Sequence, residues 1–79
     1  KVLFRDLEAK QSTILMRVDA GAIAPTHSHN QLEQIYILDG EFHDEHNCYK
    51  KGDFVVRAPG ELHTGGSNTG ARLLVYYSK

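Results

Sequence analysis

The sequence predicts an all-β protein, a small antiparallel β-barrel or jelly roll. Three observations support this fold class: short stretches alternate between apolar and polar residues, glycine-containing turns separate them, and no stretch has a convincing helical period. With 79 residues and no linker, repeat or low-complexity segment, the chain is expected to form one domain over residues 1–79. A core of this size is marginal, so a bound metal or a second copy is expected to add stability.

In the first half of the chain, residues 4–11 are compatible with a brief helical turn, and residues 13–18 alternate as a strand does. Gly21 and Pro25 break this pattern and lead into the next strand. Residues 31–38 are rich in apolar and β-branched residues and form the clearest strand. Asp39-Gly40 follows as the strongest hairpin signal, so residues 41–45 are expected to return beside that strand.

The second half continues with short strands and turns. Turns are expected at residues 46–47 and 51–53, and strands over residues 54–57 and 71–77.

Three histidines and a glutamate are spaced as one metal site. His27 and His29 lie one residue apart, so on a strand both side chains point to the same face. Glu33 can lead the next strand with its carboxylate toward the same interior, and His63 arrives from far along the chain. Imidazole nitrogens with one carboxylate suit zinc, iron, nickel, copper or manganese, and suit calcium poorly.

Glycines bracket the first three of these residues at fixed intervals: Gly21, five residues, His27, one, His29, three, Glu33, six, Gly40. This spacing resembles the first motif of the cupin family. Residues 52–63 resemble the second motif, although Ala58 stands where the family usually has proline, and Asn68 lies one residue later than the family's asparagine. Within the cupins, residues 39–45, 49, 52 and 70–77 look most like the ChrR-type subfamily.

The resemblance implies the cupin fold, a double-stranded β-helix, and one divalent metal ion (Fe, Zn, Mn or Ni). Its ligands would be His27, His29, Glu33 and His63. Four protein ligands fill a tetrahedral zinc ion, whereas an octahedral iron, manganese or nickel ion keeps two positions free for substrate and oxygen. The same residues therefore fit a catalytic or a regulatory site.

Two function classes follow, with a slight preference for the first. One is a metal-dependent oxidoreductase, similar to dioxygenases, that acts on a small organic molecule. The other is a zinc-binding regulatory or sensor module of the ChrR anti-sigma type, which needs a protein partner. Those anti-sigma factors carry a zinc-binding helical region ahead of the cupin, and residues 1–79 contain no counterpart. A sugar-acting isomerase is a lesser alternative.

Alternation predicts which side chains surround the metal. With Glu33 facing it, Ile35 and Ile37 share that face, and Phe42 and Phe54 are expected to complete an apolar pocket. Tyr36, on the opposite face, is itself apolar in character, as are other outward positions of the clearest strand and the last one. Because strands that are apolar on both faces are usually buried on both, a homodimer through the outer face is expected.

The remaining polar candidates have weaker assignments. The hairpin at Asp39-Gly40 pairs Tyr36 with His43, which places His43 on the surface. His46 lies in a turn of undefined direction. Asp44 and Glu45 are expected to be turn and rim residues. Three basic side chains could anchor an anionic substrate or act only as surface charges: Arg17, Arg57 and Arg72.

Composition excludes several partners. A net charge of −1, from 9 basic and 10 acidic residues, gives no electrostatic footprint for nucleic acid. No apolar run approaches the ~20 residues that span a bilayer, and no segment resembles a secretory signal. The single cysteine, Cys48, is compatible with the cytoplasm. Because the chain begins at Lys1, either end is expected to be trimmed or to continue into a longer protein.

Overall fold

The computed structural model describes residues 1–27 and 30–79, and the side chains of residues 1–24 and 30–79. The elements in these ranges are strands, and every pairing between them is antiparallel. In chain order they are β1 (Val2–Asp6), β2 (Gln11–Val18), β3 (Ile23–His27), β4 (Leu32–His43), β5 (Cys48–Lys50), β6 (Phe54–Arg57), β7 (His63–Gly66) and β8 (Ala71–Ser78). The predicted all-β class is confirmed.

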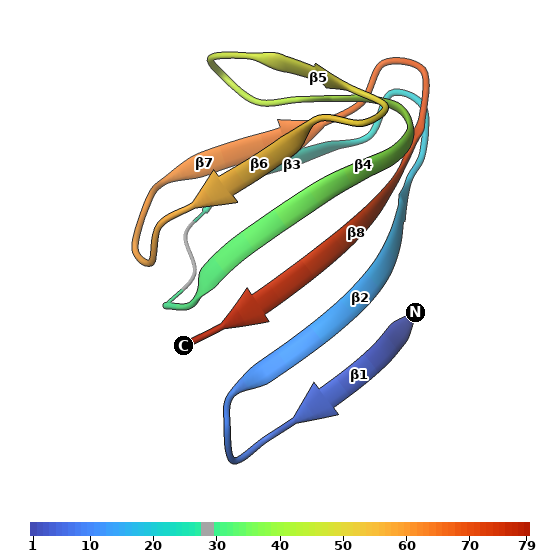
Figure 1. Cartoon of the computed structure of the whole chain (residues 1–79). Coiled ribbons are helices and arrows are strands. Elements are labelled where there is room, and N and C mark those ends of the chain that lie inside the picture. Colours follow the sequence, from blue (N-terminus) through green and yellow to red (C-terminus); the bar gives the residue numbers. More distant parts are fainter. Residues whose placement is uncertain (28–29) are drawn as a thin grey trace.

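The strands form a curled half-barrel in which two sheets share one strand (Figure 1). The main sheet has the order β1-β2-β8-β4-β6. The small sheet has the order β3-β7-β4-β5, and only the C-terminal end of β4 takes part in it. Long β4 therefore runs through both sheets and sets the angle between them.

A bulge and a glycine bend β4 where it passes from the main sheet to the small one. Ile37 pairs with Leu73 and Asp39 pairs with Arg72, so Leu38 is an extra residue in the ladder. Gly40 follows with a φ of 80°. The extra residue shifts the alternation, and as a result Ile37 and Phe42, an odd and an even position, are both buried.

The predicted hairpin at Asp39-Gly40 is wrong, because β4 continues through it to His43. Residues 41–43 pair instead with β5, and the chain turns at residues 44–47. Gly40 is required for a different reason than a hairpin turn. An ideal Cβ on Gly40 would lie 2.1 Å from the Gly70 carbonyl oxygen, so only glycine allows the two backbones to approach this closely.

The N-terminal segment also differs from the prediction of a brief helical turn over residues 4–11. Its first half belongs to β1, at the edge of the main sheet. Asp6 ends this strand, because its Oδ1 accepts the backbone N–H groups of Glu8 and Ala9 and closes a tight turn into β2.

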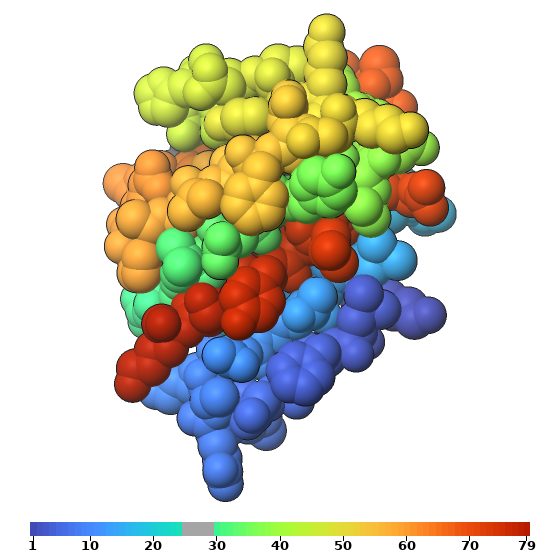
Figure 2. Space-filling model, in the orientation of Figure 1, coloured from blue at the N-terminus to red at the C-terminus, as the bar shows by residue number. Residues whose placement is uncertain are grey.

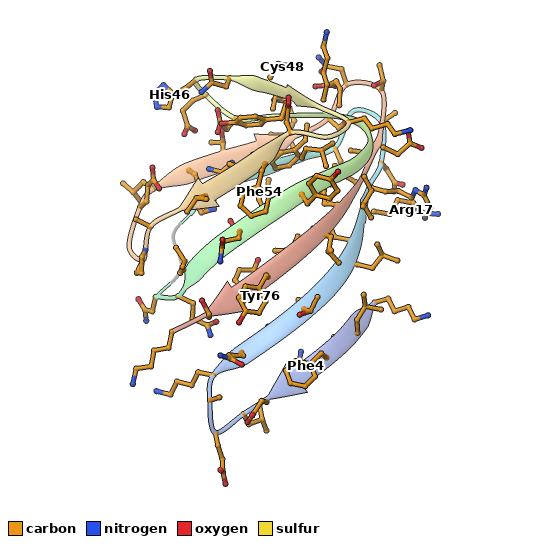
Figure 3. All side chains as sticks on the ribbon, viewed as in Figure 1. Phe4, Arg17, His46, Cys48, Phe54 and Tyr76 are labelled. Atoms are coloured by element: carbon orange, nitrogen blue, oxygen red, sulfur yellow. The ribbon has the colours of Figure 1, made fainter. Side chains whose placement is uncertain are left out.

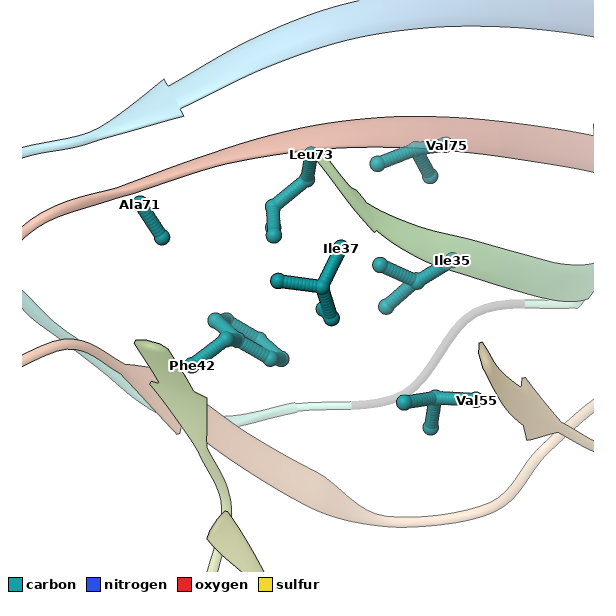
Figure 4. Close-up of a cluster of buried hydrophobic side chains, with 7 residues drawn as sticks. All are labelled: Ile35, Ile37, Phe42, Val55, Ala71, Leu73 and Val75. Atoms are coloured by element: carbon teal, nitrogen blue, oxygen red, sulfur yellow. The ribbon is translucent and has the colours of Figure 1, made fainter. Parts of the chain in front are cut away.

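The core lies in the concavity between the two sheets. Side chains from β8 and from the first part of β4 point into it, toward Phe42 and toward Val55 of β6 (Figure 4). Cross-strand pairs such as Ile35 with both Val55 and Val75 align these side chains. The buried apolar residues are Ile35, Ile37, Phe42, Val55, Ala71, Leu73 and Val75. This small set agrees with the expectation of a marginal core.

The outer face of the main sheet carries apolar side chains that are exposed to solvent. Phe4, Tyr76 and Phe54 project from the same side of the sheet (Figure 3), and this face shows β4, β8, β2 and β1 as successive bands (Figure 2). Tyr36 is 41% exposed there, as its predicted outward direction requires.

In the described part of the chain, no helix is long and apolar enough to cross a membrane.

Candidate metal centre

Glu33 and His63 come together from different sheets at one end of the concavity. Glu33 lies near the start of β4, and His63 is the first residue of β7. The His63 Nε2 atom is 3.7 Å from Glu33 Oε1, and the exposed fractions of the two residues are 5% and 6%. Two predicted ligands that are thirty residues apart in sequence are therefore neighbours in a buried site.

The His63 ring is oriented by the backbone. Its Nδ1 lies 3.1 Å from the Glu61 carbonyl oxygen, to which a protonated Nδ1 donates a hydrogen bond. In the neutral ring the Nε2 lone pair then faces the Glu33 carboxylate. Two such electron-pair donors repel each other unless a cation lies between them. Their 3.7 Å separation is near the spacing of adjacent ligands on one metal ion, about 3.0–3.4 Å for bonds of about 2.1 Å.

The sheet register places a polar side chain on each side of Glu33. Arg57 of β6 and Tyr77 of β8 are its direct partners in the two ladders. Arg57 Nε is 3.5 Å from Glu33 Oε1. The Tyr77 hydroxyl donates a hydrogen bond to Glu33; burial, this hydrogen bond and the carboxylate charge together raise the pKa of Tyr77, so the phenol stays protonated.

Arg57 also connects the site to the turn that follows β4. Its Nη2 is 3.2 Å from Asp44 Oδ2, and both side chains are almost fully buried. Burial raises the pKa of Asp44, but hydrogen bonds from the His46 and Asn47 backbone and from Tyr49, with the Arg57 charge, hold it below its ordinary value. Two carboxyl groups thus flank one buried guanidinium, and this excess of acidic over basic groups suits a cation.

A cavity of about 500 Å³ extends from this polar end. Glu33, Arg57, His63 and Tyr77 form that end. The rest of the wall is mostly apolar, with Met16, Val18, Ala22, Ile23, Ala24, Ile35, Phe42, Leu73 and Val75. Ile37 is fully buried in the core beside this wall.

The expectation that Phe54 lines the pocket is corrected, since Phe54 is 57% exposed on the outer face. Strand alternation puts Phe54 and Val56 on one face of β6, and Val55 and Arg57 on the other. The inward positions are taken by Val55 and Arg57. Arg57 points inward, where it interacts with Glu33 and Asp44. Val55 shares its face and is buried, so the larger Phe54 ring is left on the outer face.

The two remaining predicted ligands, His27 and His29, come from β3 and the residues after it. The backbone of His27 pairs with that of His63 across β3 and β7, and its side chain lies outside the described residues, as does all of His29. Within the described side chains, no group of three or more His, Cys, Asp or Glu residues is arranged to hold a metal ion. The complete ligand set therefore stays a prediction.

The other polar candidates have defined places. His43, expected on the surface, is half-buried and approaches Gly66, because β4 runs on past Asp39-Gly40. The His46 side chain is 77% exposed. Arg17 lines the mouth of the cavity and pairs with Asp19 at 3.3 Å. Arg72 lies 4.0 Å from Asp39 on the outside.

Sequence reasoning did not identify the positions of Arg57, Asp44 and Tyr77 around Glu33. The signal for Arg57 was present in the alternation of β6, which gives Arg57 and Val55 one face, but the pattern does not say which face points inward. Tyr77 and Asp44 depend on the pairing of β4 with β8 and on the turn after His43, and neither follows from local sequence.

The sequence as a whole matches the profile of one protein family, described as the ChrR Cupin-like domain, over residues 1–78. The chain belongs to this cupin family. A comparison with curated proteins finds no match.

Solved structures share the fold of this cupin. An RmlC-like cupin from Shewanella frigidimarina superposes with a TM-score of 0.82 at 24% identity, covering 89% of this chain and 67% of that one. A chain in the structure of Rhodobacter sphaeroides SigE in complex with the anti-sigma ChrR gives 0.76 at 24% identity, covering 89% and 39%. The DMSP lyase DddQ from Ruegeria pomeroyi gives 0.79 at 25% identity, covering 90% and 39%. The cupin thus spans well under half of the last two chains.

Proposed function

We propose that this cupin binds one divalent metal ion and acts, with Fe, Mn or Ni bound, as a metal-dependent, dioxygenase-like oxidoreductase on a small organic molecule. The proposed ligands are His27, His29, Glu33 and His63. The observation that carries the proposal is the meeting of Glu33 and His63, 3.7 Å apart, at the polar end of a cavity of about 500 Å³. Cavities of about this volume bind small molecules.

The described residues fit a metal ion by donor type and by charge. His63 presents Nε2 while its Nδ1 contacts a backbone carbonyl oxygen, which is how the ring of a ligating histidine is usually oriented. Arg57 and Tyr77 hold Glu33 from both sides and fix the direction of its carboxylate. When bound, an ion of this kind polarises an oxygen donor and, as iron or manganese, can change oxidation state.

The wall of the cavity narrows the class of molecule. Both arginines among the described lining residues are paired with carboxylates, Arg57 with Glu33 and Asp44, and Arg17 with Asp19. Both arginines already interact with protein carboxylates, so they are poorly placed to bind a phosphate or a second carboxylate of the ligand. The apolar wall favours a ligand with an apolar body and one oxygen-donor group. A sugar-acting isomerase fits less well, because sugar hydroxyls need polar partners.

A regulatory function is the second candidate, and the family membership favours it. A chain similar to this one lies in a complex of SigE with the anti-sigma ChrR. In this alternative the metal is zinc, the four ligands close the site, and the cupin binds a protein partner.

We also propose that two copies associate through the outer face of the main sheet, where Phe54 and Val56 are each 57% exposed. Nucleic acid and membrane are not proposed as partners. A cytoplasmic location, which the single cysteine allows, is part of the same proposal.

Elemental analysis of the protein, purified without added metal and with oxygen excluded, separates the two functions. Near-stoichiometric iron, manganese or nickel, followed by oxygen uptake with a small diketone, phenol or thiol, supports the oxidoreductase. Stoichiometric zinc with no oxygen uptake contradicts it and favours the regulatory module. Absence of any bound metal contradicts both.

A further inference from the structure

We infer that the turn Asp44–Asn47 positions both described candidate ligands, Glu33 through Arg57 and His63 through Thr64. Asp44 and Glu45 are the positioning residues. The inference rests on the proposed metal site, and it adds that this site is organised by a surface turn whose residues lie outside the ligand set.

Asp44 is held firmly by its own surroundings. Its Oδ1 accepts the backbone N–H groups of His46 at 2.9 Å and Asn47 at 2.8 Å. Its Oδ2 accepts the Tyr49 hydroxyl at 2.9 Å and lies 3.2 Å from Arg57 Nη2. Both carboxylate oxygens are therefore used, and the side chain cannot rotate without losing several bonds at once.

Arg57 transmits this position to Glu33. The guanidinium is planar and rigid, so fixing Nη2 on Asp44 also fixes Nε, which lies 3.5 Å from Glu33 Oε1. This Nε is buried, and the described residues give it no hydrogen bond, so its contact with Glu33 is purely electrostatic. Without Asp44, Arg57 would be free to close on Glu33 and compete with a metal ion for its oxygen.

Glu45, the next residue of the same turn, reaches the other ligand. Its Oε2 accepts the Thr64 backbone N–H at 2.9 Å and the Thr64 hydroxyl at 2.6 Å. Thr64 directly follows His63 and also lines the cavity. These bonds fix the start of β7 against the turn, and with it the backbone that carries the His63 ring.

The chain offers a matched control for Asp44. Asp6 makes the same local bonds, with its Oδ1 accepting the N–H groups two and three residues later, both at 3.1 Å. Asp6 lies in the turn between β1 and β2 and has no ion pair with an arginine among the described contacts. Asp6→Asn and Asp44→Asn therefore make the same chemical change in the same kind of turn.

The test measures Co²⁺ affinity by competition with a chelator, and the visible absorption of bound Co²⁺, which reports ligand geometry. We expect Asp44→Asn to weaken Co²⁺ binding by about 10- to 100-fold and to alter the spectrum, because outer-shell partners of ligands have effects of this size. Glu45→Gln is expected to act in the same direction. Asp6→Asn is expected to bind as the wild type does, with an unchanged spectrum.

Binding by Asp44→Asn within about twofold of the wild type, with the wild-type spectrum, overturns the inference. A weaker affinity with an unchanged spectrum also overturns it, since that pattern reports only a lost charge. If Asp44→Asn does not fold, Tyr49→Phe decides in its place: it removes one hydrogen bond to Oδ2, and unchanged affinity and spectrum again overturn the inference. Failure of the proposed site is distinguishable, because the wild type would then bind no Co²⁺ or His63→Ala would bind it equally well.

Discussion

At the scale of single residues, Gly40 and Glu33 show opposite kinds of constraint. Gly40 is fixed by space, because the backbone of Gly70 leaves no room for a side chain. Glu33 is fixed by charge and hydrogen bonding: Arg57 and Tyr77 hold it in a place where an unpaired carboxylate would be costly. Each position therefore accepts few substitutions, for different physical reasons.

Gly40→Ala is expected to lower the free energy of unfolding by about 3 kcal/mol or more, because a positive φ and a steric clash act together. Gly52→Ala is the control. Its φ of 92° is similar, but an added Cβ meets nothing within 4 Å, so a loss of about 1 kcal/mol is expected. Urea denaturation of both variants measures the difference. Equal losses would show that the contact with Gly70 is unimportant.

At this scale the sequence predicts the four ligands from their spacing, and the structure brings two of them, Glu33 and His63, together. The spacing of His27, His29 and Glu33 around bracketing glycines is a local signal. Arg57 is assigned to the site only by the ladder, which sets it opposite Glu33. A local pattern contains no information on which distant strand pairs with β4.

At the scale of elements, β4 and β6 show what alternation can and cannot specify. Alternation correctly separated the inward Ile35 and Ile37 from the outward Tyr36. Beyond Leu38 the predicted faces come from the assumed hairpin, which correctly places Phe42 inward. The hairpin wrongly places His43 on the surface, because β4 continues through a bulge, and a bulge has no firm sequence signature. Alternation also did not specify which face of β6 points inward, because both faces carry apolar residues. The face with the buried Arg57 points into the core, and the face with Phe54 points outward.

The assigned faces of β6 are tested by shortening two neighbouring valines. Val55→Ala removes methyl groups from the core and is expected to cost about 1–2 kcal/mol of unfolding free energy, whereas Val56→Ala, on the exposed face, is expected to change it by less than about 0.5 kcal/mol. Chemical denaturation gives both values. The measurement is made at a dilution at which the chain is monomeric, so that the proposed dimer does not bury Val56. A larger loss for Val56→Ala than for Val55→Ala would contradict the assigned faces.

At the scale of the whole molecule, stability rests on a small core together with buried and hydrogen-bonded charges. Hydrogen bonds from the Asn68 backbone lower the pKa of Glu41, and those from Thr64 lower the pKa of Glu45. The pKa of Asp44 is lowered as well. All three groups are stabilising only while they are ionised.

Acid is therefore expected to destabilise the fold. A carboxyl group whose folded-state pKa is depressed contributes stability that is complete above its unfolded pKa, 4.5 for Glu41 and Glu45 and 3.8 for Asp44. This contribution is lost as the pH falls through the folded-state pKa. The midpoint temperature of thermal unfolding should thus decrease as the pH is lowered from about 5 to about 3. The decrease should be smaller in Glu45→Gln. A midpoint that is constant over this range would contradict the assigned bonds.

The outer face of the main sheet predicts self-association. Sedimentation of the purified chain should give a mass that rises with concentration toward that of a dimer, and Phe54→Ser should shift this equilibrium toward monomer by removing an exposed ring. A constant monomer mass at all concentrations would rule out the dimer.

The central claim is that Glu33 and His63 belong to one metal site. The most direct measurement is the number of moles of metal per chain, with the thermal midpoint, in the wild type, His63→Ala and His43→Ala. We expect about one metal in the wild type, loss of metal together with stability in His63→Ala, and retention of the metal in His43→Ala. Normal metal content in His63→Ala, or equal loss in His43→Ala, would contradict the assignment.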